Sequence, residues 1–474
     1  MSPIWCWAHE LGQPDTNTRS AELRRSAGLA ARPRAHWIDD WRPNDPGFWE
    51  AGGKRVAARN LAFSILSEHV GFAVWSLWSV FVLFLGDDYG FTPAQKFLLT
   101  TAPTALGAFL RLPYTFAVAK FGGRNWTIAS SLLLLIPCVA AGLVLHPGVS
   151  FDAVLIAACV AGVGGGNFSS SMANIESFYP ERLKGWALGL NAGGGNLGVA
   201  AVQLVGLAVL ATAGKGHPRV MLGVYIPLVV VAALGAVLSM DNLTHATNEK
   251  RAMRDVARDP HTAVMSFLYI GTFGSFIGFS FAFGQVLLVQ FADTFDTPVK
   301  AASLTFLGPL VGSLIRPFGG RLADRFGGAR VTILTFAAMA LGAAVVLGAS
   351  QADSLALFIA GFITLFALSG LGNGSTYKMI PAIFTAKAAR NVAAGADMGA
   401  EARNARRLSR ALIGIAGSVG AFGGVFVNLA LRQSFLSNGT ADAAYAAFIA
   451  FYAACVAVTW AVYLRPSPRR LAGV

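Results

Sequence analysis

Two arginines stand deep inside long apolar segments of this sequence, at matching positions. Arg111 lies nine residues before Lys120, and Arg316 lies nine residues before Arg325, where the two segments end. At ~1.5 Å per helical residue, each arginine would begin roughly 14 Å from that end, near the middle of a ~30 Å hydrocarbon layer. An arginine at that depth costs at least ~2.5 kcal/mol to insert and usually marks function. The spacing therefore indicates two functional guanidinium groups at the centre of a membrane.

These guanidinium groups are expected to bind a mobile anion. Glu68 is the one acid well inside a predicted span, since Asp87 and Asp88 fall at one span end and Glu176 at another. One carboxylate cannot neutralise two arginines, and neither arginine is within a turn or two of a span end, as snorkelling would require. The planar fork of N–H donors on a guanidinium matches planar oxyanions, so nitrate, nitrite or a carboxylate fits better than a halide. Phosphate stays open on this argument.

The elements that position these residues are twelve predicted membrane spans. Of the 474 residues, 55% are hydrophobic and 13% are charged, against roughly 25% charged in soluble domains. Apolar runs of about twenty residues, the length needed to cross a bilayer, recur after short polar breaks. The sequence predicts an all-α polytopic membrane protein with spans at residues 61–85, 97–118, 126–146, 151–173, 186–211, 220–240, 263–288, 301–320, 330–349, 354–376, 410–432 and 444–464.

Positive charge is concentrated in alternate breaks between these spans. The leading segment, the breaks after the even-numbered spans and the tail carry about thirty Lys and Arg residues, whereas the opposite breaks carry about five. This asymmetry predicts a multi-pass protein of the bacterial cytoplasmic (inner) membrane with both termini in the cytoplasm. It also accounts for the net charge of +13 without a nucleic-acid partner, which would need a clustered basic face with stacking aromatics.

Other chemistry finds little support in the sequence. The four cysteines and seven histidines show no disulfide framework or metal-ligand spacing, so we expect no metal, no cofactor and no enzyme activity. The segment before the first span lacks the pattern of a cleavable signal peptide, so that span is expected to serve as an anchor.

The chain is internally duplicated. A shift of 205 positions lays Arg111 over Arg316, and a shift of 206 lays Asn167 over Asn373. Two parallel six-span halves are typical of major facilitator transporters, with substrate at the midplane between them, and an anion channel would need no such duplication. We predict a largely disordered cytoplasmic extension, a first half, a cytoplasmic linker, a second half and a cytoplasmic tail at residues 1–58, 59–240, 241–262, 263–464 and 465–474.

Small residues form regular runs in the fifth and eleventh spans. Such runs let helix backbones approach closely, so packing or gating is the role we expect of them. Asn196 lies within the first run, where a buried amide needs a partner and could donate to an oxyanion. The glycines concerned are Gly193, Gly194 and Gly195 in the fifth span and Gly420, Gly423 and Gly424 in the eleventh.

A charged loop follows the eighth span. Residues 320–330 contain Asp324-Arg325 and resemble the G-x-x-x-D-R-x-G signature of the major facilitator superfamily, a cytoplasmic charge latch between helices. The matching place in the first half has Ala119-Lys120 and lacks the acid. This motif concerns fold and gating and carries no information about the substrate.

With these residues in place, the chain resembles bacterial nitrate/nitrite porters of the NarK type from about Trp41 to Tyr463. The likeness includes the two arginines, the glycine run of the fifth span and the segments 168–175 and 272–280. In that family the arginines clamp the anion, an asparagine of the fifth span contacts it, and aromatic rings of spans 4 and 7 bracket it. The resemblance therefore implies a nitrate or nitrite site built from Arg111, Arg316, Asn196, Phe168, Tyr269 and Phe273.

Two ionisable residues bear on how transport is driven. Glu68 in the first span and Lys378 after the tenth resemble the subgroup of this family that takes up nitrate with protons, whereas exchangers look devoid of protonatable groups near the site. Buried ionisable groups are the usual proton relays. We therefore expect nitrate/proton symport by a monomer, with nitrate/nitrite antiport as the alternative. The plainer interpretations are that Glu68 pairs with His69 or with a neighbouring span and only orders the helix, and that Lys378 is an interfacial cation.

Overall fold

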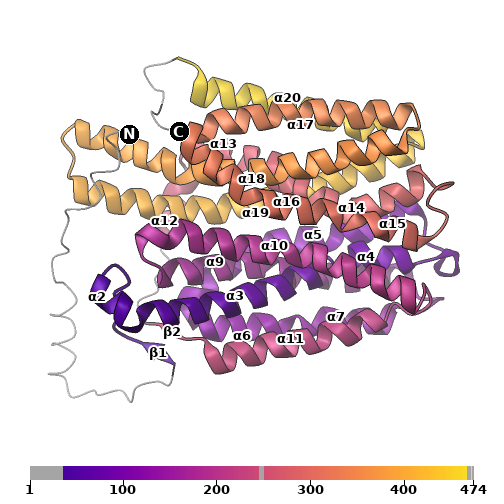
Figure 1. Cartoon of the computed structure of the whole chain (residues 1–474), viewed down its shortest axis with the longest axis horizontal. Helices are drawn as coiled ribbons and strands as arrows, with labels where there is room; N and C mark the ends of the chain where they lie inside the picture. Colours follow the sequence, from indigo (N-terminus) through magenta and orange to yellow (C-terminus); the bar gives the residue numbers. More distant parts are fainter. Residues whose placement is uncertain (1–35, 245–249, 467–470, 472–473) are drawn as a thin grey trace.

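The fold was analysed on a computed structural model, which describes residues 36–244, 250–466, 471 and 474. Long helices run side by side along the longest axis of the molecule, and the only sheet among the described residues has two short strands (Figure 1). The first half of the chain, coloured indigo to magenta, forms one side of the bundle, and the second half, coloured orange to yellow, forms the other. The two halves meet along a seam that contains both arginines.

The first half consists of helices that are continuous or broken near the middle. Its elements are α3 (Lys54–Trp75) and α4 (Leu77–Phe84), α5 (Pro93–Phe121), α6 (Gly123–Leu133) and α7 (Leu135–Val144), α8 (Phe151–Val160), η4 (Ala161–Gly166) and α9 (Asn167–Phe178), α10 (Glu181–Thr212), and α11 (Val220–Ser239). The short elements α2 (Pro46–Phe48), η2 (Trp49–Gly53) and η3 (Asp87–Tyr89) precede or connect them.

The second half repeats this plan. Its elements are α13 (Pro260–Tyr269), η5 (Ile270–Gly274) and α14 (Ser275–Gln290), α15 (Pro298–Thr305) and α16 (Leu307–Phe326), α17 (Gly328–Gln351), α18 (Leu355–Ala393), α19 (Met398–Asn438), and α20 (Asp442–Thr459) with η6 (Trp460–Leu464). The 3₁₀-helical segment η4 and the π-helical segment η5 interrupt α-helices beside the seam, and such irregular segments are frequent near functional sites.

The prediction of a twelve-span helical membrane protein is confirmed. Eleven helical segments among the described residues are long and apolar enough to cross a bilayer. The twelfth expected span is α5, which has 29 residues but contains Arg111, Lys96, Lys120 and two prolines. Large apolar side chains of the outer helices face outward, as a lipid environment requires; Leu143, Leu334 and Leu341 are each about 70% exposed.

Two helices extend well past their predicted spans. The spans expected at 354–376 and 410–432 are parts of α18 (Leu355–Ala393) and α19 (Met398–Asn438). Hydropathy marks only the portion of a helix that contacts lipid. The intervening residues are rich in Ala, Arg and Lys, which are strong helix formers, so each helix continues beyond the membrane.

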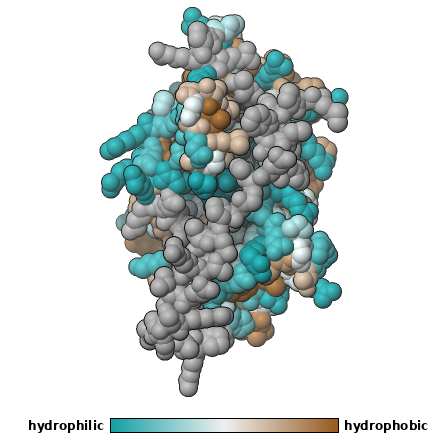
Figure 2. Space-filling model, turned by 90° about the vertical axis from the view of Figure 1, so that its left-hand side faces the viewer, coloured by the Kyte–Doolittle hydropathy of each residue, from teal (hydrophilic) through white to brown (hydrophobic). Residues whose placement is uncertain are grey.

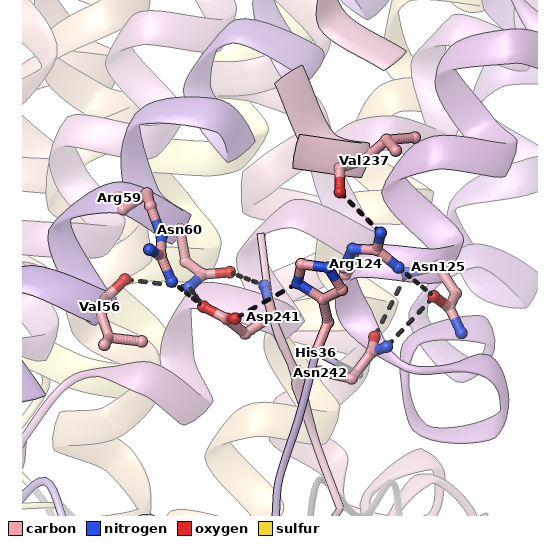
Figure 3. Close-up of polar contacts among 9 residues, drawn as sticks. All are labelled: His36, Val56, Arg59, Asn60, Arg124, Asn125, Val237, Asp241 and Asn242. Carbon is pink, nitrogen blue, oxygen red and sulfur yellow. Dashed lines mark hydrogen bonds and ion pairs between the residues drawn. The ribbon is translucent and has the colours of Figure 1, made fainter. Parts of the chain in front are cut away.

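A small two-stranded sheet closes one end of the first half. Strand β1 (Trp37–Ile38) pairs in parallel with β2 (Asn242–Leu243), which follows α11. Asp241, 8% exposed, accepts hydrogen bonds from Arg59 Nη2 at 2.6 Å and Asn60 Nδ2 at 3.0 Å (Figure 3). The same figure shows Arg124 Nη2 donating to the carbonyl of Val237 at 2.7 Å. We call this end of the bundle, on the left of Figure 1, the strap end.

The strap end carries the segments predicted to lie outside the membrane. Figure 2 views it face on, and its coloured surface is mostly hydrophilic. The predicted linker, 241–262, contains β2 and the short helix α12 (Lys250–Ala257), and residues 245–249 lie outside the described residues. The disorder predicted for the leading extension concerns mainly residues 1–35, which also lie outside the described residues, whereas residues 36–58 form β1, α2, η2 and the start of α3.

Candidate functional site

Arg111 lies at the seam between the halves, where α5 packs against α19. Its side chain is fully buried, and Nη1 donates to the carbonyl of Gly417 in the opposite half at 3.0 Å. The guanidinium carbon lies 4.6 Å from the ring centre of Phe168 and 4.7 Å from that of Phe273, so both rings are close to the group. Its Nε and Nη2 atoms are buried without a hydrogen-bond partner. Two of its donors therefore remain available to a ligand.

Arg316 occupies the equivalent place in α16 and is 7% exposed. Its Nη2 lies 3.4 Å from the hydroxyl of Tyr269, and its Nη1 is buried without a partner. The guanidinium carbon is 6.0 Å from the ring centre of Phe168, the same ring that covers Arg111. The two arginines of the duplicated halves thus share one site.

The site holds more positive than negative charge. Among the described residues, no carboxylate oxygen lies within 4.0 Å of either guanidinium group as an ion pair. The nearest acid, Glu68 of α3, is close enough to act electrostatically on both arginines. Two guanidinium groups against a single carboxyl leave an excess positive charge in a buried place, where an unpaired charge is costly and an anion would be held strongly.

Glu68 is bound to its own half and does not pair with His69. Its Oε2 accepts hydrogen bonds from Ser171 Oγ at 2.6 Å and from Asn191 Nδ2 at 2.7 Å, while Oε1 is buried without a partner. His69 Nδ1 instead lies 3.0 Å from the carbonyl of Gly194. The carboxyl group is therefore fixed on one side and has one oxygen unengaged.

Aromatic rings wall the arginine site. The three rings expected from the family resemblance lie together: the centres of Phe168 and Phe273 are 6.2 Å apart, and those of Tyr269 and Phe273 are 5.4 Å apart. Phe72 and Trp75 of α3 also face Arg111, at 5.9 and 5.5 Å from its guanidinium carbon. Rings at these distances attract the cations and keep water out, which strengthens electrostatic attraction to an anion.

Asn196 is buried in α10 at 1% exposure. Its Oδ1 position has no hydrogen-bond partner. The two ends of an amide are distinguished only by their hydrogen bonds, so either the amide oxygen or the amide nitrogen can be turned toward this place. The side chain is therefore free to meet a ligand, and its contact with the anion stays a prediction.

The glycine runs set how closely the helices approach the site. In α10, a methyl group added to Gly195 would collide with the Glu68 carboxyl, and one added to Gly194 would collide with Ile65, but one on Gly193 would meet nothing within 4 Å. In α19, a methyl group on Gly420 would collide with the Tyr269 ring, one on Gly423 with the backbone of Gly274, and one on Gly424 with Ile277 and Thr104.

We expect Gly195→Ala to impair the protein and Gly193→Ala to leave it intact. The added methyl group at Gly195 must displace the Glu68 carboxyl, and such overpacking costs about 1–3 kcal/mol. At Gly193 the space is open, and alanine in a helix is favoured over glycine by about 0.5–1 kcal/mol. Thermal unfolding in detergent and anion uptake by both variants check this. Equal behaviour of the two variants would show that contact with Glu68 is not what the glycine provides.

The charged residues predicted after the eighth span form an exposed latch at the strap end. Lys378 Nζ lies 3.0 Å from Asp324 Oδ2, with the two side chains 41% and 60% exposed. Arg325 lies over the Phe326 ring at 5.1 Å. The structure thus places Lys378 with Asp324, in agreement with the interfacial alternative, rather than beside Arg111 and Arg316.

Sequence reasoning missed several groups that surround the site. Ser171 and Asn191 hold Glu68, and the Gly417 carbonyl holds Arg111. Tyr377 of α18 lies over Arg316, with its ring centre 5.7 Å from the guanidinium carbon. The polar run 169–171 and the amide of Asn191 inside apolar segments were available signals, because polar side chains at membrane depth need partners. A backbone carbonyl leaves no such signal.

The seam is closed at one end and hollow at the other. Away from the strap end, Thr100 donates to Asn428 at 2.8 Å, Gln203 donates to the Ser280 carbonyl at 2.8 Å, and the Trp75 ring packs on Phe281. On the strap side a cavity of about 90 Å³ begins at Phe168 and Tyr377 and reaches Glu176 and Arg410. The cavity thus extends from rings that cover the arginines toward the strap end, although neither arginine lines it.

Comparisons with known proteins agree with this architecture. The sequence model of a family described as Major Facilitator Superfamily matches residues 70–400. Among solved structures, a nucleoside transporter, NupG, superposes with a TM-score of 0.60 at 12% identity, covering 85% of this chain and 99% of its own. A D-xylose-proton symporter superposes with a TM-score of 0.59 at 14% identity, covering 87% of this chain and 97% of its own. These two similarities concern the fold alone.

Curated relatives are considerably closer in sequence. "Nitrate/nitrite transporter NarU" of Salmonella typhimurium is 39% identical over 455 residues, which cover 91% of this chain and 97% of the relative. "Probable nitrate/nitrite antiporter NarK2" of Thermus thermophilus is 32% identical over 453 residues, which cover 90% of this chain and 97% of that relative.

Proposed function

The chain belongs to the major facilitator superfamily, and we propose that it carries nitrate, and also nitrite, across the membrane by alternating access. The observation that carries this proposal is the pair of buried arginines at the seam, neither of which has a carboxylate partner among the described residues. The names of its curated relatives point to the same substrates.

The anion is proposed to lie between the two guanidinium groups. The partnerless donors Nε and Nη2 of Arg111 and Nη1 of Arg316 would each donate to an oxygen of the anion. The rings of Phe168 and Phe273 lie close to the Arg111 guanidinium, so an anion bound there would contact aromatic side chains as well as the donors. The planar forks of the two guanidinium groups favour planar nitrate or nitrite over tetrahedral phosphate, which the sequence argument left open.

Transport then requires that the seam open at each end in turn. We propose that the strap end faces the cytoplasm, as the positive charge of its loops favours. The closed contacts at the opposite end and the cavity at the strap end would make this conformation one that communicates with the cytoplasm. Rocking of one half against the other would break the Thr100–Asn428 contact and expose the arginines to the other side.

Glu68 is the proposed proton carrier. It is fully buried, acts on both arginines and has one oxygen without a hydrogen-bond partner. A single carboxyl binds a single proton, so one nitrate with one proton would cross as a neutral pair, and the pH gradient rather than the membrane potential would drive uptake. Lys378 is left out of this proposal because it forms an exposed ion pair with Asp324.

Nitrate/nitrite exchange is the second candidate. The relative from Thermus thermophilus is named an antiporter, and the rings and arginines of the site would hold either anion. In that case Glu68 would only balance charge and orient α3 against α10.

Uptake of isotopically labelled nitrate into proteoliposomes distinguishes these modes. Symport predicts that uptake rises when the outside is made more acidic than the inside, and that a potential imposed with valinomycin and potassium has little effect. Exchange predicts indifference to the proton gradient together with stimulation by nitrite loaded inside. Absence of saturable nitrate uptake under all of these conditions would contradict the proposed function.

A further inference from the structure

The cavity between the arginine site and the strap end carries at its outer limit, which we call its mouth, an ion pair that joins the two halves. Glu176 of α9 accepts a hydrogen bond from Nε of Arg410, which belongs to α19. The side chains are 24% and 48% exposed, so both contact water. Exposed pairs of this kind contribute little to stability, about 0–1 kcal/mol, which leaves the pair free to exchange partners.

The inner limit of the cavity carries a donor that no protein group uses. The hydroxyl of Tyr377 is buried without a hydrogen-bond partner, and its ring lies 5.7 Å from the guanidinium carbon of Arg316. The same ring lines the cavity together with Phe168. Tyr377 therefore lies between the arginine site and the cavity, and its hydroxyl can donate to an anion on either side.

An anion that leaves the two arginines toward the strap end must enter this cavity. A volume of about 90 Å³ has room for a small oxyanion with few waters, so much of its hydration must be replaced by protein groups. Glu176 repels the anion and Arg410 attracts it. Arg406 and Arg410 also act on nearby Glu181, so the surroundings of the mouth are rich in cations.

We infer that the cavity is a second, transient binding station for the transported oxyanion, with Tyr377 as its inner donor and Arg410 as its outer cation. In the structure Glu176 pairs with Arg410. An arriving anion takes over Arg410 from Glu176, and loss of that ion pair loosens the contact between α9 and α19 and opens the mouth. This inference rests on the proposed function and adds a route and an exit trigger to it.

Neutral variants of the two mouth residues separate a binding station from a simple latch. Arg410→Gln is expected to slow nitrate exchange in proteoliposomes about tenfold, since it removes the cation that draws the anion through the cavity. Glu176→Gln, which frees Arg410, is expected to leave exchange at or above the wild-type rate. Equilibrium nitrate binding to the purified protein in detergent should change less than about twofold in both variants. Arg403→Gln, on an exposed arginine of the same helix, is the matched control.

A latch without anion binding gives a different result. Both variants break the same ion pair, so their exchange rates would change in the same direction and by similar factors, and that outcome would overturn the inference. A wild-type rate for Arg410→Gln would overturn it as well. Both results would leave the proposed function intact, because that function is contradicted by the absence of saturable nitrate uptake by the wild-type protein.

Discussion

Replacing Arg316 by lysine is expected to reduce nitrate transport about a hundredfold. Lysine keeps the positive charge but loses the planar fork, so it cannot donate to the anion from Nη1 while Nη2 contacts Tyr269. A hydrogen bond to a charged group contributes about 1.5–3 kcal/mol, and the lost alignment of the anion with Arg111 adds to this. Initial rates of labelled nitrate uptake across a range of concentrations measure the loss.

A matched variant controls for the replacement of arginine by lysine as such. Arg321→Lys changes an exposed arginine of the same helix, whose guanidinium lies 5.7 Å from the Phe318 ring, and should transport normally. Near-normal uptake by Arg316→Lys would show that a point charge is sufficient and that the planar match between guanidinium and oxyanion plays no part in selecting the substrate.

Replacing Glu68 by glutamine is expected to abolish the response of nitrate uptake to a proton gradient. Glutamine preserves the size of the side chain, and its oxygen can accept from Ser171 and Asn191 as Glu68 Oε2 does. Its amide nitrogen would take the place of Oε1, which accepts no hydrogen bond that would be lost. The variant should therefore fold and still exchange nitrate for nitrite, but it has no carboxyl group to carry the proton.

The measurement compares uptake with the outside at lower pH against uptake with equal pH on both sides. In the wild-type protein the ratio should exceed one, and in Glu68→Gln it should equal one. Glu181→Gln, at the strap end, serves as the control and should keep the wild-type ratio. A Glu68→Gln protein that still responds to the gradient would mean that another group carries the proton or that the gradient acts elsewhere.

The functional importance of Arg111 and Arg316 was predictable, because the free-energy cost of placing a guanidinium group in the membrane can be read from the apolar residues around it in the sequence. A guanidinium in the middle of an apolar run is unfavourable whatever surrounds it, so two such residues at duplicated positions indicate function before any packing is known. The rings of Phe72 and Trp75 carry no comparable signal. Aromatic side chains are common in membrane helices, and only the crossing of α3 with α5 brings these two against Arg111.

The remaining parts of the site depend on contacts between segments far apart in the chain. The glycine run of α10 predicted close packing, but only the structure distinguishes Gly195, which faces the Glu68 carboxyl, from Gly193, which faces open space. Lys378 could be placed beside a proton path or at an interface, because its position at the end of an apolar run allows both; the structure shows it in an exposed ion pair with Asp324.

The pairing of Glu176 with Arg410 could not be predicted from the sequence either, because it too joins segments far apart in the chain. The two residues are 234 positions apart and lie in different halves, so their contact depends on which end of the seam is open. A carboxylate near the end of one predicted span and an arginine at the start of another are ordinary features when each is considered separately.

A structure determined with nitrate bound tests the central claim most directly. We predict a planar anion between the guanidinium groups of Arg111 and Arg316, accepting hydrogen bonds from both and lying between the rings of Phe168 and Phe273. In an Arg316→Lys protein, the density for this anion should be weakened or lost. An anion bound elsewhere while both guanidinium groups stay engaged with protein atoms, or turn toward lipid, would contradict the account.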